Sequence, residues 1–548
     1  MTEEHVVTSR VYDAIVVGAG AAGCFAAKEL TEGGLSVLLL DAGPEVEPVR
    51  DFPVPPPRNR GLIDRALLAL RGQHVQARCA AFNRATQRFY VTDRDNPYST
   101  PEGKPFNWFR GRQIGGRLHT WGRVVPRFSD WELKPSTHVA AGMDWPIGHK
   151  DLAPYYDRVE RFLGVHGTPE GLPHLPDGAF IAPRGLNALE EHVRDEIVKR
   201  WPNRRFIPAR VVKHNPARIP LPLVAAMQTG RLTVRANAVA KCIRMETHRA
   251  RARGVAFVDR TTRRPVEAEG RVIVVCASAI ESVRILLNSA CSGHPNGLGN
   301  SSGLLGRFLM DHCMVAVGGA VPDTLSHARG PAGIQTGGDP YDLASLYIYM
   351  PGFRNITEPC SAFSGSYSIL GAVARSDSTF LFLGFGEMLP YPENRVTINP
   401  KVCDAWAVPA AHVECTHFRN ERALIADMVG SMREMAAAAG LEVQQGFPVA
   451  NRGLLAMLYR RLGRKVWTSY DALHPGTAMH ELGGARMGDD PRSSVLNRFN
   501  QCWDVPNLFV TDGACFVSSG YQNTTLTIMA LTVRACEFIV AQCRRGNL

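Results

Sequence analysis

The first forty positions of the chain carry two short apolar runs that frame a helical stretch. The first run covers 12–17 and ends in the sequence Gly-Ala-Gly-Ala-Ala-Gly. An alanine-rich stretch follows, a glycine pair stops it, and the second run covers 35–40. Apolar runs of this length are typical of buried strands, and the stretch between them has the length of a helix. The pattern therefore predicts a βαβ unit.

Apolar runs later in the chain predict two further kinds of structure. Residues 271–276 and 507–511 each form a short apolar run, which again indicates buried strands of an α/β unit. Between about 315 and 417 the runs are bounded by Gly, Pro, Asn and Asp, a pattern that predicts an antiparallel sheet. A helix that Asn420 caps and Gly440 ends is expected to follow.

The order of these elements predicts the domain organisation. We expect an α/β fold: a discontinuous Rossmann-like domain into which an α+β domain, built on the antiparallel sheet, is inserted. At 548 residues the chain is long enough for two or three structural units. The Rossmann-like domain is expected to cover 1–150, 230–312 and 475–548, and the inserted domain 151–229 and 313–474.

Composition narrows the class of protein. Hydrophobic residues make up 45% of the chain, as in ordinary globular proteins. The net charge of +11 would suit an anionic partner, but the basic residues are scattered apart from short clusters such as that at 460–465. This distribution favours a solvated basic surface, and we expect no nucleic acid partner.

Cysteine spacing and apolar content suggest where the protein works. None of the thirteen cysteines are spaced as Cys-x-x-Cys, which predicts buried free thiols in a reducing compartment and neither a metal site nor a disulfide framework. The polar start and the lack of a long uninterrupted apolar run predict a cytoplasmic protein without a membrane span.

The glycines after the first apolar run are candidates for binding a nucleotide. Gly18, Gly20 and Gly23 have the spacing of the dinucleotide fingerprint, in which the glycines serve the turn, the approach to the pyrophosphate and helix packing. The start of the helix offers free N–H groups to phosphates. Asp41, with Ala42 beside it, ends the second run, where a carboxylate can accept hydrogen bonds from ribose hydroxyls. A chance glycine-rich turn is the alternative, and the motif alone does not separate NAD from FAD.

Two later segments are candidates for the rest of a cofactor site. The stretch 110–127 is interrupted by four glycines, so we expect a loop pressed against a ligand. Asp512 and Gly513 end a late strand, where open α/β sheets place ligands. Asp-Gly is also a common turn, and the two interpretations of Asp512 are equally supported.

His480 and Asn523 are candidates for acid–base chemistry. Hydride transfer from an alcohol carbon requires removal of the hydroxyl proton, and a neutral imidazole has a suitable pKa. An amide can hold the same oxygen as it gains negative charge. Any one of the 17 histidines is more often structural than catalytic, and His474 is the nearest competitor. The pair Gly483-Gly484 favours His480, because glycines permit a close approach of backbone to a flat cofactor ring.

With these residues in place, the chain resembles the glucose–methanol–choline (GMC) family of FAD-dependent alcohol-oxidising enzymes. The resemblance extends over nearly the whole length. It rests on the Gly-Ala-Gly-Ala-Ala-Gly start, Arg-Gly-Arg-Gln-Ile-Gly-Gly at 110–116, Leu-Gly-Arg-Phe-Leu-Met-Asp-His at 305–312, His-Glu-Leu-Gly-Gly at 480–484 and Gln-Asn-Thr-Thr-Leu-Thr at 522–527. The segments 95–101, 143–147 and 170–178 look most like bacterial sugar-oxidising members, of the glucoside 3-dehydrogenase and the gluconate or fructose dehydrogenase large-subunit type.

The resemblance implies FAD as cofactor and hydride transfer from a CH–OH group of a sugar, glycoside or cyclitol-like alcohol to flavin N5. It implies His480 as the base, Asn523 as its partner, and the antiparallel sheet as a roof that sets substrate choice. Implied cofactor contacts are Gly18, Gly20, Gly23, Asp41 and Ala42 at the ADP half, Val239 by the adenine, and Arg112, Gly115, Gly116, Thr120, Trp121, Asp512, Gly513 and Thr525 at the flavin half.

Three departures from the family pattern refine these expectations. Sugar dehydrogenase subunits carry a cysteine-rich segment, but 211–226 contains no cysteine, which argues against an iron–sulfur relay and favours oxygen, a quinone or a redox protein as acceptor. Relatives with covalent flavin carry a histidine where Thr120 stands, and His119 is one residue early, so we expect non-covalent FAD. Thr524 stands where family members commonly have proline, which changes loop rigidity but not the chemistry.

Three alternatives to this function stay open at the level of sequence. Another flavin enzyme, such as a monooxygenase, could share the fingerprint, and it would be reduced by NADPH. A non-catalytic relative could serve as a binding subunit, although the presence of both His480 and Asn523 argues against it. An NAD-dependent dehydrogenase is disfavoured by the two closing blocks.

Overall fold

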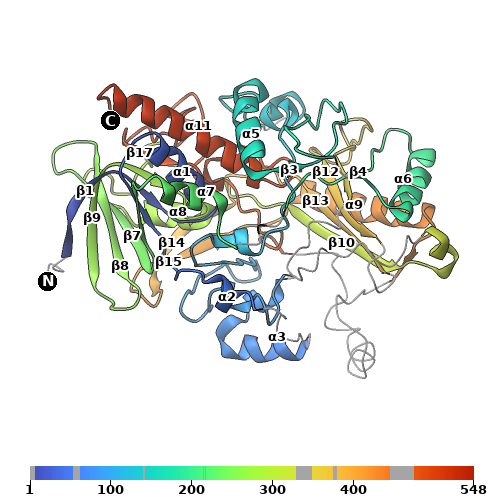
Figure 1. Cartoon of the computed structure of the whole chain (residues 1–548), viewed down its shortest axis with the longest axis horizontal. Helices are drawn as coiled ribbons and strands as arrows, with labels where there is room; N and C mark the ends of the chain where they lie inside the picture. The colour runs from blue at the N-terminus through green and yellow to red at the C-terminus, as the bar shows by residue number, and fades with distance from the viewer. Residues whose placement is uncertain are drawn as a thin grey trace.

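Two sheets joined by helices and long loops make up the computed structural model of the chain. It describes residues 6–53, 62–79, 81–139, 142–183, 185–213, 215, 218–328, 348–373, 379–444 and 474–548. One sheet lies near the N-terminus, and the other lies toward the opposite end of the long axis (Figure 1). Helices α5 (His149–Leu163) and α11 (Thr525–Arg544) pack together along one side.

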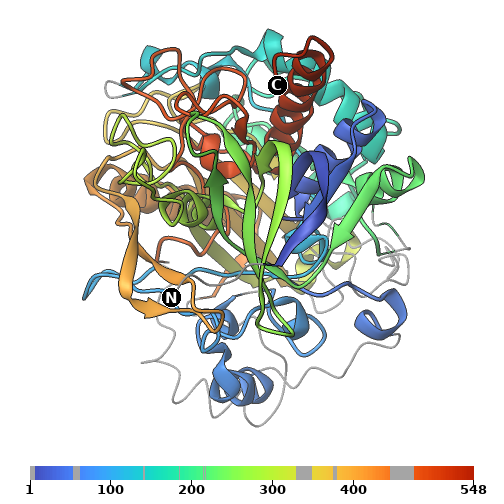
Figure 2. The same ribbon diagram turned by 90° about the vertical axis from the view of Figure 1, so that its left-hand side faces the viewer.

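The first sheet has seven strands and faces the viewer in Figure 2. Its order is β6-β2-β1-β9-β8-β7, and β17 pairs with the last residues of β9. Strands β6, β2, β1, β9 and β17 are parallel, while β8 and β7 form an antiparallel extension. The strands are β1 (Val6–Val17), β2 (Val37–Leu40), β6 (Leu232–Arg235), β7 (Ala238–Met245), β8 (Ala252–Asp259), β9 (Pro265–Val275) and β17 (Leu508–Val510). With α1 (Ala21–Glu32) between β1 and β2, the predicted βαβ unit is confirmed.

The central strands of this sheet are buried on both faces, which explains their nearly continuous apolar sequence. Ala14 and Val16 of β1 pack in the core that includes residues of α1 and α11, while Ile15 and Val17 pack in the core that includes α8 (Ala279–Leu287). The register aligns the carboxyl ends of β1, β9 and β17. The segments that follow these strands therefore meet at one edge of the sheet.

The second sheet is antiparallel and has six strands in the order β16-β10-β13-β12-β11-β4. They are β4 (Ile207–Pro208), β10 (Cys313–Ala320), β11 (Ile348–Met350), β12 (Tyr367–Val373), β13 (Thr379–Gly386) and β16 (Glu442–Val443). Helix α9 (Arg419–Ala438) covers one face. Glycines on β13 permit this packing, because a Cβ at Gly386 would lie 2.2 Å from Leu424. The predicted cap at Asn420 is wrong: its amide oxygen accepts from the backbone of Ser364, and Glu421 bonds the backbone N–H of Phe418 instead.

One expected strand of the antiparallel sheet lies elsewhere. The run that begins at Arg395 forms β14 (Arg395–Cys403), which pairs with β15 (Pro409–Glu414) as a separate two-stranded sheet. The hairpin packs on α8 beside the first sheet, where its Trp406 and Val408 join an apolar cluster with Val239. Four of the nine residues of β14 are exposed, which agrees with a place outside both large sheets.

The two sheets draw on separate parts of the chain. Strands of the first sheet come from 6–40, 232–275 and 508–510, and strands of the second come from 207–208, 313–386 and 442–443. The exact domain boundaries stay a prediction, and the basic cluster at 460–465 lies outside the described residues. The remaining elements include α2 (Pro48–Asp51), α3 (Leu62–Leu68), α4 (Asp130–Leu133), α6 (Ala188–Arg200), α7 (Leu221–Gln228), β3 (Val165–His166) and β5 (Val211–Val212).

Among the described residues, one helix is long and apolar enough to cross a membrane by length and composition. This helix is α11, whose most apolar window has a mean hydropathy of 1.5. Because 67% of that window is buried inside the protein, α11 is packed like the core helix of a globular domain. The cytoplasmic location stays a prediction. All thirteen cysteines are free.

Candidate active site

The three glycines after β1 have different roles. Gly18 has a φ of +101°, and a Cβ there would lie 2.5 Å from the carbonyl oxygen of Cys276. Gly23 lies inside α1, and its Cβ would lie 1.7 Å from the Gly18 carbonyl. Gly20, which precedes α1, has no atom within 4 Å of its Cβ position. Gly18 and Gly20 line a cavity at the edge of the first sheet, whereas Gly23 serves packing.

Asp41 holds the glycine turn in place. Its Oδ2 accepts a hydrogen bond from the N–H of Ala19 at 2.8 Å, and its Oδ1 accepts from the N–H of Gly43 at 2.8 Å. Burial raises the pKa of Asp41, which these hydrogen bonds oppose. Asp41 lines the cavity, but Ala42 and Val239 do not: both lie in the apolar cluster around Trp406.

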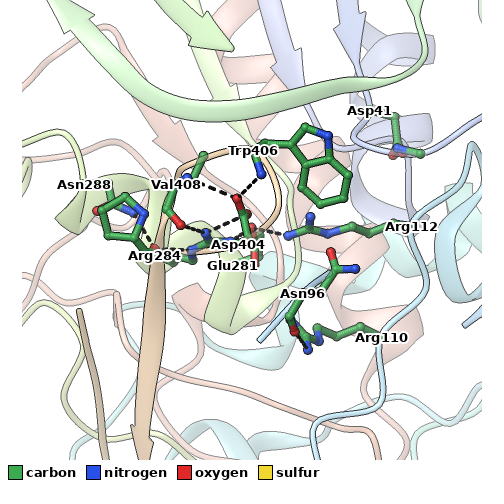
Figure 3. A network of polar contacts seen from close by, with 12 residues as sticks. Asp41, Asn96, Arg110, Arg112, Glu281, Arg284, Asn288, Asp404, Trp406 and Val408 are labelled. Atoms are coloured by element: carbon green, nitrogen blue, oxygen red, sulfur yellow. Dashed lines mark hydrogen bonds and ion pairs between the residues drawn. The ribbon is translucent and has the colours of Figure 1, made fainter. Parts of the chain in front are cut away.

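A buried network of charges lies beside Asp41 (Figure 3). Glu281 Oε1 accepts from Arg112 Nη2 and from Arg284 Nη1, each at 2.8 Å. Arg284 also donates to Asp404 Oδ2 at 2.8 Å and so ties α8 to the β14–β15 hairpin. Burial raises the pKa of Glu281, but the charges of Arg284 and Arg112 more than offset this and bring it to about 2. Glu281 is therefore a carboxylate at neutral pH.

The network leaves two polar atoms without partners. Arg112 Nη1 and Glu281 Oε2 are buried, and neither has a hydrogen-bond partner among the described residues. Both side chains line the cavity. Since an unpaired buried polar atom costs about 1–3 kcal/mol, these two atoms are suited to bind a polar ligand.

The loop after Arg112 crosses the cavity near the start of α1. Gly115 and Gly116 have φ values of +93° and +52°, and a Cβ at Gly116 would lie 3.1 Å from the Cα of Gly20. The loop continues as a short 3-10 helix, Gly116–His119. Gly116, Thr120 and Trp121 line the cavity, whereas Gly115 does not.

Arg112 lines the cavity at the end that holds Asp41. Its charge acts on Asp41 and Glu281, at the nucleotide end. The arginine of this loop that reaches the catalytic end is Arg117, which donates to the Met479 carbonyl at 2.7 Å and whose charge acts on His480. Arg117 was not predicted as an individual site residue, although it lies inside the loop 110–127 that was expected to contact a ligand.

Asp512 joins two segments at the carboxyl edge of the sheet. Its Oδ2 accepts from the N–H of Ser278 at 2.9 Å and from the Ser282 hydroxyl, and its Oδ1 accepts from the N–H of Ala514 at 2.9 Å. Burial raises the pKa of Asp512 to about 6. Asp512 and Gly513 line the cavity together with Thr525, the first residue of α11. Asp512 thus forms a structural turn and also faces the site.

His480 and Asn523 meet at the same cavity. His480 Nε2 lies 3.4 Å from Asn523 Nδ2, and both residues line the cavity with Thr525. The pKa of His480 is lowered well below its usual value, chiefly by burial and then by His312 and Arg117. The Oδ1 of Asn523 is buried without a hydrogen-bond partner among the described residues. The pair presents one basic nitrogen and one amide to a ligand.

Residues 311–312, at the start of β10, hold the catalytic loop. The Asp311 carboxylate accepts from the backbone N–H groups of Gly476, Ala478 and His480, at 2.7, 3.2 and 2.9 Å. His312 Nδ1 lies 2.8 Å from His480 Nδ1. Neither residue was named as a site residue from the sequence. The signal was the block 305–312, whose position in space the chain order does not reveal.

Comparisons with known proteins agree with this geometry. Models described as GMC oxidoreductase match residues 218–314 and 390–532, and a model described as FAD binding domain matches residues 13–48. The chain belongs to the GMC oxidoreductase family. It is an FAD-dependent oxidoreductase that acts on an alcohol or sugar CH–OH group.

Several relatives align with this GMC oxidoreductase over almost its whole length. The chain is 28% identical to 2-methyl-1,2-propanediol dehydrogenase of Mycolicibacterium austroafricanum, over 96% of this chain and 95% of that protein. It is 26% identical to the fructose dehydrogenase large subunit of Gluconobacter japonicus (97% and 98%) and to paromamine 6'-oxidase of Streptomyces fradiae (97% and 91%). The solved structure of pyridoxine 4-oxidase from Mesorbium loti has the same fold, with a TM-score of 0.58 at 18% identity, over 96% of this chain and 98% of that one.

The cavity of this GMC oxidoreductase fits FAD. The open side of Gly20 and the start of α1 suit a pyrophosphate, which needs a close backbone approach and free N–H groups. The unpaired atoms of Arg112 and Glu281 suit the polar groups of the ADP half. The start of α11 at Thr525 brings a second positive helix end to the catalytic end of the cavity.

One interpretation of nearby residues was wrong. Gly483 and Gly484 do not line the cavity: a Cβ at Gly483 would lie 2.1 Å from the Phe308 carbonyl oxygen, and one at Gly484 would lie 2.7 Å from Val283. These glycines permit packing of backbone against protein, not against a cofactor ring. The competitor His474 is exposed and does not line the cavity.

Proposed function

We propose that this GMC oxidoreductase oxidises a CH–OH group of a sugar, glycoside or cyclitol-like alcohol with His480 as the general base. The observation that carries the proposal is the approach of His480 Nε2 and Asn523 Nδ2 to 3.4 Å at the cavity. A hydroxyl that lies against both atoms can donate its proton toward the imidazole nitrogen while its oxygen accepts a hydrogen bond from the amide.

The electrostatics of the pair suit proton removal. Because burial holds the pKa of His480 well below its usual value, the imidazole is neutral at pH 7 and its lone pair is available. As the hydroxyl loses its proton, the growing charge on oxygen is stabilised by the N–H donor of Asn523. When bound, FAD supplies the acceptor for the hydride that leaves the alcohol carbon.

Hydrogen-bond donors at the same end of the cavity suit the polar edge of a flavin. Arg117 is held by the Met479 carbonyl at 2.7 Å, by the Ser278 hydroxyl at 3.2 Å and by the buried Glu481 carboxylate at 2.8 Å, which balances its charge. The N-terminus of α11 adds free N–H groups at Thr525. Arg117 and this helix end are the parts of the chain that we assign to the flavin half.

We infer that the FAD is held without a covalent bond. The side chain of His119 faces away from the cavity: its Nε2 lies 2.7 Å from the Ile114 carbonyl oxygen, and its ring stacks on Phe89 at 5.4 Å. Thr120, which does line the cavity, has no nucleophile suited to a flavin bond.

An apolar cluster connects the base to the second sheet. The ring of Phe385 lies 5.5 Å from the ring of His480, and Phe385 belongs to an apolar cluster with Tyr349, Leu370 and Ala478. Tyr349, Leu370 and Phe385 lie on strands β11–β13 of the second sheet, and Ala478 of the same cluster lines the cavity, which supports our proposal that this sheet borders the site. A second candidate substrate is a small branched diol, of the kind named for the relative from Mycolicibacterium.

We propose oxygen, or a quinone or redox protein that reaches the flavin directly, as electron acceptor. The support is the lack of cysteine in 211–226, which leaves that segment without ligands for an iron–sulfur cluster. Reoxidation by air after anaerobic bleaching tests this proposal, and a reduced flavin that stays reduced in air but reoxidises with a quinone identifies a dehydrogenase.

Anaerobic bleaching of the flavin tests the function. The purified yellow protein is mixed with D-fructose, D-gluconate, paromamine, a β-glucoside, myo-inositol and 2-methyl-1,2-propanediol, and the loss of flavin absorbance is recorded. General base catalysis contributes about 10²- to 10⁴-fold, so His480→Ala should slow bleaching by that factor with FAD still bound. His474→Ala is the matched control, because His474 is exposed and outside the cavity.

Other outcomes of this experiment identify other functions. Bleaching of the His480→Ala variant at the wild-type rate means that the base is wrongly assigned. Reduction by NADPH but by none of the alcohols identifies a monooxygenase-like enzyme. A colourless protein that takes up no FAD contradicts the whole assignment.

A further inference from the structure

His312 is a buried histidine that belongs to no catalytic assignment made above. It is only 1% exposed, and it follows Asp311 directly before β10. Its Nε2 lies 2.9 Å from the carbonyl oxygen of Gly520, and its Nδ1 lies 2.8 Å from His480 Nδ1. The two imidazole rings are nearly perpendicular, with an interplanar angle of 87° and centroids 4.9 Å apart. One ring therefore uses both nitrogens, one on backbone and one on the candidate base.

The hydrogen-bonding partners determine where the protons lie. A carbonyl oxygen can only accept, so His312 must donate its Nε2–H to Gly520. Burial lowers the pKa of His312 to about 4, so the ring is neutral at pH 7 and its Nδ1 carries a lone pair. The contact between the two Nδ1 atoms needs one proton, which must then be on His480.

The tautomer of His480 follows from this chain of donors and acceptors. His480 carries its proton on Nδ1 and donates it to His312, so the lone pair of the neutral ring is on Nε2. Nε2 is the nitrogen beside Asn523 at the cavity. The opposite tautomer would place an N–H where the alcohol proton has to be received, and proton removal would be blocked.

The surroundings of the two rings hold this arrangement. Phe385 packs against both, with ring centroids 5.5 Å from His480 and 6.3 Å from His312. Asp311 accepts a hydrogen bond from the backbone N–H of His480 at 2.9 Å, and Arg117 donates to the carbonyl of Met479 at 2.7 Å. These two contacts hold the backbone that carries the His480 ring. Asp311 and Arg117 act on the backbone, whereas His312 bonds the ring nitrogen.

We propose that His312 is a positioning residue that fixes His480 in the Nδ1–H tautomer and accepts its hydrogen bond while His480 takes the alcohol proton. The proposal rests on the proposed function, because it requires His480 to be the base. As Nε2 gains the proton, no bond to His312 breaks, and the Nδ1–H of the imidazolium donates more strongly to the His312 lone pair. Hydrogen bonds to charged groups contribute more than neutral ones, so the hydrogen bond from His480 to His312 becomes stronger as His480 is protonated.

A double-mutant cycle tests whether His312 acts through His480. His312→Gln places an amide near the former Nε2 position, which keeps a donor for Gly520 but removes the acceptor at Nδ1. Using the panel alcohol that bleaches fastest, we expect this variant to slow the limiting rate of bleaching about 10- to 100-fold with little change in the alcohol concentration at half-maximal rate. In a His480→Ala background, the same substitution should change the slow residual rate less than about two-fold.

Proton NMR of the protein without substrate gives a second measurement. Two exchange-protected imidazole N–H signals at low field are expected for this cluster, from His312 Nε2 and His480 Nδ1. The His480→Ala variant should lose one, and the His312→Gln variant should lose both. If His312→Gln fails to fold, ¹⁵N-histidine spectra of the wild type and of His480→Ala still show which nitrogen of His480 carries the proton.

The outcomes separate this inference from the proposed function. If His480→Ala bleaches at the wild-type rate, both the base and its positioning residue are wrong. If His480→Ala is slow but His312→Gln has the same effect in both backgrounds, His312 has only a structural role and the function stands. A proton on Nε2 of His480 in the neutral enzyme also overturns the inference.

Discussion

Replacing Gly20 with alanine separates cofactor binding from folding. The backbone at Gly20 has a φ of −83° and a ψ of −158°, which alanine can adopt, and a Cβ there meets no atom within 4 Å. The apoprotein should therefore lose less than about 1 kcal/mol, the cost of alanine in place of glycine before a helix. The affinity for FAD should fall more than the stability, because the methyl group occupies the space that the pyrophosphate needs. Overpacking of this kind costs about 1–3 kcal/mol, so we expect a Kd for FAD about 5- to 150-fold weaker.

Gly18→Ala is the matched control for this experiment. Gly18 has a φ of +101°, and its Cβ would lie 2.5 Å from the Cys276 carbonyl oxygen, so alanine there should destabilise the apoprotein itself. The assay is titration of each apoprotein with FAD, followed by quenching of flavin fluorescence, beside thermal unfolding without FAD. Gly20→Ala with an unchanged Kd would refute the reasoning, because the cofactor would then not approach Gly20 closely.

Three further predictions concern the charge network, the base and the cofactor. Asp404→Asn removes one partner of a buried ion pair, so it should lower the free energy of unfolding by about 3 kcal/mol and speed proteolysis within 395–414. Asp490→Asn, in an exposed ion pair, is the control and should change neither quantity. Because the pKa of His480 is lowered in the folded enzyme, its neutral form persists as pH falls below the usual histidine pKa of about 6.5. Loss of rate from protonation of His480 should therefore appear only below about pH 6.5. Burial raises the pKa of Asp311, which binds the backbone N–H of His480, to about 7, so an inflection near pH 7 should be absent from Asp311→Asn, and one that persists in that variant would contradict this. Acid precipitation should release all yellow colour into the supernatant, since His119 faces away from the cavity, and a yellow pellet would mean a covalent bond.

The parts of the site that sequence could predict are those set by local chain geometry. The glycine turn after β1 was predictable because strand, turn and helix are consecutive, and the strand–helix–strand pattern fixes where Gly18 and Gly20 lie. His480 and Asn523 were predictable as candidates because small residues and family blocks surround them. Their approach to 3.4 Å depends on how two distant loops pack, which no local pattern contains.

The missed or misplaced residues depend on contacts between segments far apart in sequence. His312 lies 168 positions before His480, and its second nitrogen bonds a carbonyl 208 positions after it. The partner of Arg112 is Glu281 of α8, which lies 169 positions later, so the sequence could not show which part of the cavity this side chain faces. Gly483 was correctly flagged as a site of close approach, but its neighbour is the backbone of Phe308 and not a ligand.

The β14–β15 hairpin has a practical consequence for enzyme engineering. In sequence it interrupts the segment that supplies most strands of the second sheet, but in space Asp404 binds Arg284 of α8, beside the first sheet. An exchange of the second sheet between related enzymes, made to change alcohol specificity, should therefore not replace 313–444 as one segment. Two crossovers on either side of 395–414 would leave the hairpin with the host. Such a chimera would combine the second sheet of one enzyme with the intact contact between Arg284 and Asp404 of the other.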